Sequence, residues 1–480
     1  MNLVIICLDT FRADIIGKGQ RLSHVETPHL DRFAEESVCF TRAFGEGQPT
    51  LQMRRSAMTG MRSFPWRWNF DRRGHWHHAP GWHKIPPEYD TLAEILLERG
   101  YMTGLVADTY HMFKPTMNYT RGFVTYEFVR GQETDNWRGG TPEMIADGLR
   151  RSLRHPAQYR RYPALVQYLY NQRGRKNEED YQCARVFRAA ADWLEDNHTN
   201  APFFLWVDSF DPHEPWDPPE EVAEKYIKGY QGLDFIYPGL GGKRSAEEDE
   251  RLEALYFGEV TLVDRWVGHL LDELDALGRR EDTLVILTSD HGTQMFDHGQ
   301  VGKGPDHLHP YNTRLNLYVR HPGTPGGQRA DGFVQAHDIP ATALTLLGIV
   351  APMEGQNAWP LVTGESSSIR DHVVIGWARF CNGRAEARVS VRDDHWNYVV
   401  GVGYEDPEPE LYDLQHDPEE RINVVHRYPD VVARQRKRIE AVTGQPLPGM
   451  MNECCDAGPA PISVYLAQQG MHGGGVRRRP

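Results

Sequence analysis

The sequence predicts an α/β fold, with a mixed, mainly parallel sheet flanked by helices and a small C-terminal antiparallel subdomain. Four apolar segments, separated by helix-like segments, each end in Asp, His or Thr: 3–8, 104–107, 202–207 and 283–288. Continuous apolar runs of this kind are typical of buried parallel strands, and ligands bind at the carboxyl ends of such strands. Beyond about residue 370, alternation over 389–400 predicts a hairpin. We expect a main domain over 1–370 and an α+β subdomain with a loose tail over 371–480.

The segments between these strands have recognisable starts and periodicities. Thr27 and Pro28 suit the N-cap and first position of a helix. A short strand over 38–43 leads to the loop that carries Thr50. Residues 64–87 lack periodicity and suggest a surface excursion, and residues 126–180 suggest an insertion with one or two helices. Further helices are predicted over 27–36, 89–99, 181–197, 252–277 and 428–442.

Composition limits the classes of partner and compartment. The chain has 480 residues and a net charge of -14, which makes nucleic acid an unexpected partner. The N-terminus has no basic region or cleavage site, and no apolar run reaches membrane-spanning length. Six cysteines show no framework spacing, and the adjacent Cys454 and Cys455 read as incidental. We expect free thiols and a cytoplasmic location.

Two strand ends carry residues that suit a divalent cation. Asp9 follows the first strand, and Asp290 and His291 follow the fourth. Two carboxylates and an imidazole can bind Mn²⁺, Ca²⁺, Mg²⁺ or Zn²⁺, with oxygen ligands favouring the harder ions. For Asp9, capping of the following turn is the alternative.

The stretch over 48–60 places a hydroxyl at a helix N-terminus and a guanidinium one turn later. Thr50 Oγ could coordinate the metal, lose its proton and act as a nucleophile, while Arg54 binds the equatorial oxygens of an ester. Lys303 and His213 could hold the same anion or protonate the leaving group. A plain N-cap for Thr50 and surface or capping roles for Lys303 and His213 are the alternatives. Displacement at phosphorus or sulfur needs such a set.

Several stretches together resemble one family, the sulfatase branch of the alkaline phosphatase superfamily. They are 4–14 with the metal-binding Asp9, 27–34, the Thr59-Gly60 anchor, 283–292 with Lys303 downstream, 337–342, and 410–414 with Asp417, Pro418, Glu419 and Asn423. The resemblance covers residues 3 to about 425 and implies the alkaline-phosphatase-like fold and an ester hydrolase.

This sequence departs from the family pattern at the nucleophile. The Thr59-Gly60 anchor places Thr50 at the family's Cys or Ser position, Gln52 at its Pro and Arg54 at its Arg. The family oxidises that Cys or Ser to formylglycine, but the carbinol carbon of Thr carries a methyl group, so no formylglycine is expected. Relatives in the superfamily use an unmodified Thr to form a covalent phospho-enzyme.

Other departures concern the metal count and the substrate. We expect one divalent metal ion (Mn²⁺, Ca²⁺ or Zn²⁺) rather than two, because the three ligands of a second zinc site are not all recognisable, although His298, His307 and His309 could supply some of them. Thr10 stands where the family often has a second acidic residue. Asp108 replaces a family Lys, and Asp108, Tyr110 and His111 are expected to bind substrate. Phosphonate monoester hydrolases, which are close relatives in the family, also lack that Lys and use Tyr and Thr nearby.

These observations lead to three hypotheses. The first is a metal-dependent hydrolase with Thr50 as nucleophile that cleaves a phosphodiester or a phosphonate monoester. The second is a sulfatase that acts without formylglycine, and the third is a non-catalytic homologue that binds an anionic ligand. The expected partner is a small anionic ester, with no nucleic acid and no membrane. Association with a second copy of the chain is left open.

Overall fold

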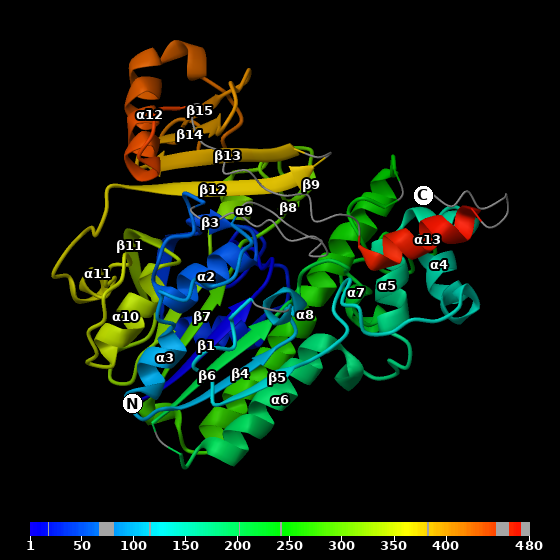
Figure 1. Ribbon diagram of the computed structural model, residues 1–480, viewed down its shortest axis with the longest axis horizontal. Helices are drawn as coiled ribbons and strands as arrows, with labels where there is room; N and C mark the ends of the chain where they lie inside the picture. Colours follow the sequence, from blue (N-terminus) through cyan, green and yellow to red (C-terminus); the bar gives the residue numbers. More distant parts are fainter. Residues whose placement is uncertain are drawn as a thin grey trace, which may run out of the picture.

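A computed structural model describes residues 1–17, 19–66, 81–114, 117–200, 202–240, 242–381, 384–447 and 460–471. Its centre is an eight-stranded sheet in the order β11-β2-β10-β7-β1-β6-β4-β5 (Figure 1). The strands are β1 (Asn2–Leu8), β2 (Val38–Phe44), β4 (Met102–Ala107), β5 (Thr125–Phe128), β6 (Phe203–Ser209), β7 (Thr283–Ser289), β10 (Leu317–Arg320) and β11 (Gln328–Gln335). β10 pairs antiparallel with β2 and β7, and the other pairs are parallel. The prediction of a mixed, mainly parallel sheet is confirmed.

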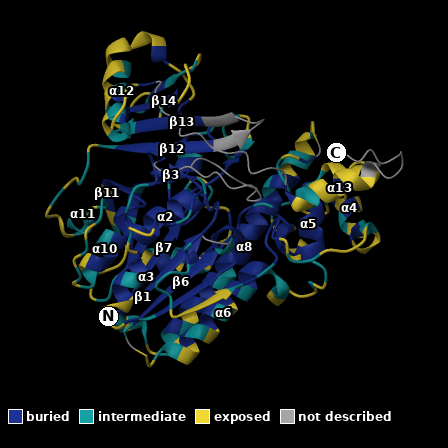
Figure 2. Cartoon of the chain, in the orientation of Figure 1, coloured by how far each residue is buried: buried dark blue, intermediate teal, exposed yellow. Residues whose placement is uncertain are grey.

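Both faces of this sheet are covered, which explains the continuous apolar runs. Val4, Ile6 and Leu8 of β1 join a core with α1 (Pro28–Glu35), α6 (Gln182–Asn197) and α8 (Ala246–Ala276). The alternate residues Leu3, Ile5 and Cys7 join a second core with α2 (Leu51–Thr59), α3 (Leu92–Leu97) and α10 (Asp338–Leu346). Figure 2 shows the central strands β1, β6 and β7 as buried, whereas the edge strand β5 is exposed. Side chains of successive residues point to opposite faces, so both parities must be apolar here.

Two helices begin where capping boxes place them, not where the predicted periodicity began. In α8, Ser245 accepts a hydrogen bond from Glu248 N, and Glu248 Oε2 accepts one from Ser245 N, so the helix starts at Ala246 rather than 252. Thr91 and Glu94 form the same motif before α3, which therefore starts at Leu92 rather than 89. The Ser/Thr-x-x-Glu spacing was present in the sequence and was missed.

The start of α1 is capped from another helix. Thr27 occupies the N-cap position, as predicted, but its side chain does not cap the helix. Asp264 of α8 instead accepts hydrogen bonds from His29 N at 3.3 Å and Leu30 N at 2.7 Å. A buried carboxylate on a neighbouring helix thus satisfies the free amides of α1 and fixes the two helices against each other.

Three strands of the large sheet escaped prediction because each lacks a clear apolar pattern. β5 is a short edge strand with exposed residues, and β10 has only four residues. β11 carries Asp331 and Gly332 at a register shift between Ala330 and Phe333. Their pairing comes from the neighbouring strands rather than from their own composition.

A second, five-stranded sheet has the order β15-β14-β13-β12-β3. Its strands are β12 (His372–Cys381), β13 (Arg384–Asp393), β14 (Trp396–Gly401), β15 (Glu410–Asp413) and β3 (Gly47–Gln48), and α12 (Pro429–Thr443) packs against β12 and β13 (Figure 1). The predicted hairpin is the β13–β14 pair, so the small antiparallel sheet is confirmed. β3, however, comes from the segment just before Thr50 and joins β12 in parallel. The division of the chain at residue 370 stays a prediction.

The insertion forms a helical lobe beside the sheet. It contains α4 (Ala146–Ser152), α5 (Pro163–Asn171) and the 3-10 helices Pro142–Ile145, Pro156–Arg161 and Glu178–Asp180. α13 (Pro461–Met471) packs against α5 and the 3-10 helix Pro156–Arg161 (Figure 1). The other short elements include α7 (Glu220–Ala223), β8 (Gln294–Met295), β9 (Val301–Gly302), α9 (Pro310–Thr313) and α11 (Pro360–Thr363). Residues 67–80 of the predicted excursion, Cys454, Cys455 and the predicted tail lie outside the described residues.

Two observations bear on the expected compartment. Within the ranges that the structure describes, no helix is both long and apolar enough to cross a membrane. Cys7, Cys39 and Cys183 are free thiols. The cytoplasmic location stays a prediction.

Candidate active site

The carboxyl ends of four parallel strands meet at one edge of the large sheet. Cys7 of β1 lies in register with Asp208 of β6 and with Thr288 of β7, and Ala107 of β4 lies in register with Asp208 on the other side. The residues at and just after the ends of these strands therefore lie close together. Four aspartates at this edge have no exposed surface: Asp9, Asp108, Asp208 and Asp290.

Asp9, Asp290 and His291 form a buried cluster whose ligand atoms all lie within 4.8 Å of one another. His291 Nδ1 lies 2.9 Å from the carbonyl of Gly292, which can only accept, so Nδ1 carries the proton. The lone pair of Nε2 then faces Asp9 Oδ1 at 3.8 Å and Asp290 Oδ2 at 3.5 Å. Burial lowers the pKa of His291 to about 3, so the ring is neutral. Three of the predicted metal ligands are thus brought together.

Arg54 lies behind this cluster and is completely buried. Its Nη1 is 3.0 Å from Asp9 Oδ2 and 2.8 Å from Asp290 Oδ2. Its Nε and Nη2 both donate to Asp208, with distances of 2.9–3.0 Å. Every nitrogen of the guanidinium therefore donates within the protein, and its contact with an ester stays a prediction.

The charges of this group leave room for a divalent cation. Three buried carboxylates face one guanidinium, which gives a formal charge of -2. Burial and the neighbouring Asp290 raise the pKa of Asp9 although Arg54 opposes them. His291 Nε2 has no hydrogen-bond partner among the described residues. A divalent ion would balance the charge and use this lone pair, so the residues fit such an ion.

Thr50 lies next to the same cluster in a backbone conformation that β-branched residues rarely adopt. Its φ is 41°, and its side chain makes no capping hydrogen bond to α2, so the plain N-cap alternative is not what the structure shows. Its carbonyl accepts from Arg54 N and Arg54 Nη1, each at 3.2 Å. Arg54 therefore contacts both the backbone of Thr50 and the carboxylates of Asp9 and Asp290.

The second sheet holds the Thr50 loop from the other side. Gln48 of β3 lies in register with Trp377 of β12. The ring of Trp377 is 5.3 Å from that of His291, measured between centroids. One tryptophan thus joins the strand before Thr50 to a predicted metal ligand.

Lys303 reaches the cluster through Thr10. Lys303 Nζ lies 3.1 Å from Thr10 Oγ1, which donates to Asp9 Oδ1 at 2.7 Å. Thr10 has a φ of 59°, a second positive value on a β-branched residue at this site. Lys303 also pairs with Glu214 Oε2 at 2.6 Å. Thr10, which stands at the position of the family's second acidic residue, thus links Lys303 to Asp9.

His213 is buried beside this ion pair. Its Nδ1 donates to the carbonyl of Glu214, and its ring stacks on Phe210 with centroids 4.1 Å apart. Burial lowers the pKa of His213, although Glu214 opposes this. The neutral ring keeps a free lone pair on Nε2 and can accept a proton.

The predicted substrate-binding residues form a second buried group. Asp108 Oδ1 accepts from Phe210 N at 2.7 Å, and Tyr110 donates to Glu133 Oε2 at 2.6 Å. The ring of His111 packs against that of Tyr110, with centroids 3.9 Å apart and planes inclined by 36°. Phe210 separates this group from His213. Contact of Asp108, Tyr110 and His111 with a substrate stays a prediction.

A cavity of about 440 Å³ has Lys303 and Glu214 in its wall. The rest of the wall is mainly apolar, and it comes from the insertion, from the loop before α8 and from β9: Arg161, Tyr162, Pro163, Ala164, Leu165, Tyr237, Pro238, Gly239, Leu240, Val301 and Gly302. Tyr237 has a buried hydroxyl without a hydrogen-bond partner among the described residues. We call this space the lysine cavity.

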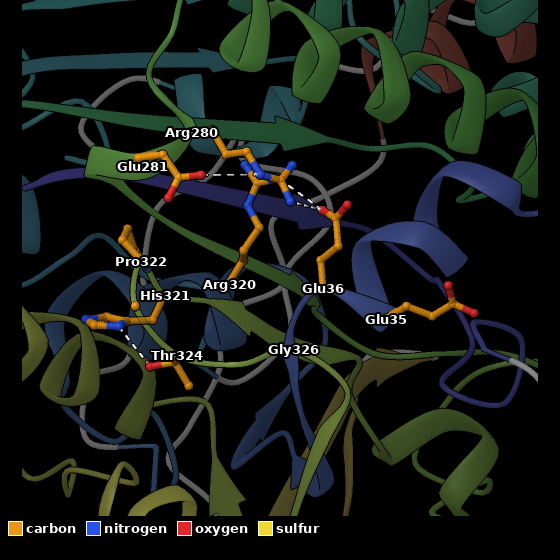
Figure 3. A pocket seen from close by; sticks show the side chains of 10 residues that line it. Glu35, Glu36, Arg280, Glu281, Arg320, His321, Pro322, Thr324 and Gly326 are labelled. Atoms are coloured by element: carbon orange, nitrogen blue, oxygen red, sulfur yellow. Dashed lines mark hydrogen bonds and ion pairs between the residues drawn. The ribbon is translucent and has the colours of Figure 1, made fainter.

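A cavity of about 380 Å³ at the opposite edge, where β7 begins, contains none of the predicted residues (Figure 3). Its charged side chains contact one another: Arg280 Nη2 lies 2.8 Å and Arg320 Nη1 3.4 Å from Glu36 Oε2. These ion pairs account for the charges without a ligand.

The predicted ligands of a second metal lie elsewhere. His298 and His309 stack with centroids 4.0 Å apart, and His309 Nδ1 lies 2.7 Å from Glu420 Oε2. Among the described residues, neither belongs to a group of three metal-binding side chains, and nor does His307.

Sequence reasoning assigned no role to four residues that the structure places at the site. Asp208 follows the apolar run 202–207 as Asp9 follows the run 3–8, and that position in the sequence was a usable signal. Glu214 adjoins His213, but its pairing with Lys303 depends on the tertiary fold. Trp377 and Glu133 come from distant segments with no local signal.

Comparison with known proteins shows extensive similarity. The "Sulfatase" family model matches residues 1–349, and the model "N-sulphoglucosamine sulphohydrolase, C-terminal" matches residues 306–445. An arylsulfatase of Clostridium perfringens is 24% identical and covers 88% of this chain and 90% of its own length. An N-acetylgalactosamine-6-O-sulfatase of Bacteroides thetaiotaomicron is 24% identical, with 90% and 91% covered. The structure of a phosphonate monoester hydrolase of Agrobacterium radiobacter superimposes with a TM-score of 0.70 at 21% identity, over 92% of this chain and 95% of that chain, which confirms the alkaline-phosphatase-like fold.

A divalent ion bound by Asp9, Asp290 and His291 would stabilise the folded chain. Mn²⁺ at 100 times its Kd should raise the free energy of unfolding by about 2.7 kcal/mol, because only the folded chain presents the cluster. Asp290→Asn should remove most of this gain. The measurement is chemical unfolding with and without Mn²⁺, together with metal content after dialysis.

The matched control for this test is Asp147→Asn, because Asp147 has a fully exposed side chain far from the cluster in sequence. It should keep the full gain. Equal stabilisation of wild type and Asp290→Asn would place the ion elsewhere.

Proposed function

The chain belongs to the sulfatase family and is an ester hydrolase, and we propose that it cleaves a phosphodiester or a phosphonate monoester with Thr50 as its nucleophile. The observation that carries this proposal is the threonine itself. It stands beside a buried carboxylate and imidazole cluster, at the position where the resemblance requires a residue that can become formylglycine. Because the family and the matched relatives are ester hydrolases, we set aside the alternative of a non-catalytic homologue.

A bound divalent ion would supply Lewis acidity, which lowers the pKa of a nearby hydroxyl and offsets negative charge on the ester. Asp9, Asp290 and His291 would hold it, with Thr50 as a further proposed ligand. Arg54 supports this set by keeping three carboxylates close together, so its role in the proposal is to position the ligands.

The proposed reaction has two displacements. Thr50 Oγ forms a bond to phosphorus and gives its proton to a base, while the bond from phosphorus to the leaving oxygen breaks and that oxygen receives a proton from an acid. Water then attacks phosphorus of the covalent Thr50 intermediate, Thr50 Oγ leaves and regains a proton, and the second product is released. Water is the one co-reactant, and no oxidant is required. A hydrate of formylglycine would release its product by a different route, without attack of water at the central atom.

Two residues support the proton transfers. His213 is neutral, with a lone pair on Nε2, so it is suited to accept a proton rather than to hold an anion. Lys303 carries a proton beyond those donated to Thr10 and Glu214, and it lines the lysine cavity. We therefore assign the leaving oxygen to Lys303 and the base role to His213.

The lysine cavity indicates which part of the ester leaves. A leaving group whose oxygen contacts Lys303 extends into a mainly apolar space of about 440 Å³. Tyr162, Pro163, Leu165 and Pro238 offer ring and aliphatic surface. An aromatic or bulky apolar alcohol fits this wall better than a methyl group does.

Cleavage of a sulfate ester is the second candidate. The specific observation in its favour is that the two relatives described above, each covered over at least 90% of its length, are named as sulfatases. Against it stands Thr50, because a sulfo-threonine has no release route comparable to that of the formylglycine hydrate.

The nucleophile is tested by Thr50→Ala. We expect its kcat on the preferred substrate to fall by at least about 10³-fold, as for other lost nucleophiles, while Mn²⁺ binding persists. Initial rates are measured with Mn²⁺-loaded protein on p-nitrophenyl sulfate, p-nitrophenyl phosphate, bis-p-nitrophenyl phosphate and p-nitrophenyl phenylphosphonate. Dominant sulfate cleavage, or full activity in Thr50→Ala, would overturn the mechanism.

Filling the lysine cavity should separate substrates by leaving group. Ala164→Trp should lower kcat/KM for a p-nitrophenyl ester by about tenfold or more, because the indole occupies the space, and should leave the methyl ester of the same acid nearly unchanged. Ala157→Trp, an exposed position outside the cavity wall, is the control. A parallel loss on both esters would show damage to the site rather than a leaving-group effect.

The carboxyl of Glu133 should make kcat/KM depend on pH. Burial raises its pKa to about 7, although the hydrogen bond from Tyr110 opposes this and Glu214 adds to it. Above pH 7 the ionised carboxylate weakens the attraction of Lys303 for an anionic ester. We expect kcat/KM to fall as pH rises through 7, and Glu133→Gln to remove this inflection. The exposed Glu127→Gln is the control, and an unchanged profile in Glu133→Gln would exclude this assignment.

A further inference from the structure

A cavity on the insertion is lined by several arginines. Its volume is about 250 Å³, and its wall consists of Trp137, Arg138, Asn171, Gln172, Arg173, Gly174, Arg175, Asp180, Gln182 and Arg185. The wall therefore contains four arginines and one carboxylate, in a chain whose net charge is -14. We call it the arginine cavity. Positive charge concentrated in this way, on an otherwise acidic protein, requires a physical reason.

Three of the four arginines have no carboxylate partner. Arg175 pairs with Asp217. Arg138, Arg173 and Arg185 form no ion pair with any carboxylate that the structure describes; they donate instead to the carbonyl of Arg173, to Met144 Sδ and to the carbonyl of Arg130, respectively. Each guanidinium has five N–H groups, so most of its donors remain for a ligand.

Part of this positive charge is buried or held in place. Arg173 Nε is buried and has no hydrogen-bond partner among the described residues, although the residue as a whole is half-buried. Burial lowers the pKa of Arg185, and the nearby Arg138 adds to this. Arg138 lies over the ring of Trp137, with Cζ 3.8 Å from the centroid, which holds its guanidinium in place. Arg138 and Arg185 thus lie close enough to repel each other, and a bound anion would offset this repulsion.

A helix N-terminus adds to the positive field. α6 begins at Gln182, which lines the arginine cavity, and the side chain of its N-cap residue Tyr181 makes no capping hydrogen bond. The N-terminus of a helix of 16 residues favours negative charge. The next amide, Cys183 N, donates to Asp211 Oδ2 at 3.1 Å. The first turn of α6 therefore contacts both the arginine cavity and Asp211.

We propose that the arginine cavity binds a tetrahedral oxyanion, either a free sulfate or phosphate ion or the corresponding group on an ester. Guanidinium forks of Arg138, Arg173 and Arg185 match the oxygen spacing of such groups. The site does not depend on the reaction proposed for Thr50. Because Gln182 and Cys183 are adjacent, an anion here is separated from Asp211 only by the first turn of α6.

The test is titration calorimetry of the purified full-length protein with sodium sulfate, sodium phosphate and a glucose sulfate, at constant ionic strength set with chloride. Wild type is compared with the double variant Arg138→Gln/Arg185→Gln. Loss of charge-assisted hydrogen bonds should raise Kd by about tenfold or more. The matched control is Arg188→Gln, an exposed arginine of α6 outside the cavity, which should bind as wild type does.

A second background separates this site from the metal cluster. Asp290→Asn should keep the oxyanion binding, and a loss of binding in that variant alone would assign the anion to the cluster and overturn the proposal. Tighter binding of the glucose sulfate than of inorganic sulfate would identify an ester as the ligand, and the reverse would identify the free ion. Equal heats for chloride and sulfate would also overturn it.

If the double variant does not fold, selenate soaked into crystals of wild type gives a direct answer by anomalous scattering. A selenium peak between Arg138 and Arg185 supports the proposal. A peak only at the Asp9, Asp290 and His291 cluster contradicts it.

Discussion

The interaction between Arg54 and three buried carboxylates is the constraint on which the site depends. The guanidinium offsets the repulsion between the buried carboxylates of Asp9, Asp208 and Asp290, which lie close together at the edge of the sheet. Arg54 lies one turn into α2, so its placement also fixes Thr50 at the start of that helix. The nucleophile proposed here is therefore held by the same residue that balances the ligands, and β3 secures the loop from the second sheet.

Much of the site could be predicted because it follows from strand order. Asp9 comes directly after one apolar run, Asp290 and His291 come just after another, and adjacent parallel strands bring them together. Asp208 also follows an apolar run, but the sequence analysis assigned it no role. The link from Lys303 through Thr10 to Asp9 could not be predicted, because it requires a positive φ at Thr10 and a loop that returns from β9.

Contacts between distant segments also set the positions of several side chains and the start of some helices. α8 begins at its capping box rather than at its first apolar residue, and α1 is capped by Asp264 from 234 residues further along the chain. Glu133 and Tyr237 gain their environment from the insertion, whose polar composition gave no position for either side chain. Local patterns therefore identified the strands and their ends, whereas side chains from loops were fixed only by packing.

The packing of α13 has a consequence for how such a chain can diversify. This helix contacts α5 and the 3-10 helix Pro156–Arg161, and these segments, with Tyr162 between them, supply residues 161–165 of the lysine cavity wall. Asp9, Asp290 and His291 instead follow β1 and β7 at the edge of the large sheet. Mutations in α13 can thus reshape the wall of the cavity without altering the residues of this cluster. In the proposed mechanism, substrate range and reaction chemistry depend on different parts of the chain, so selection can act on one part without changing the other.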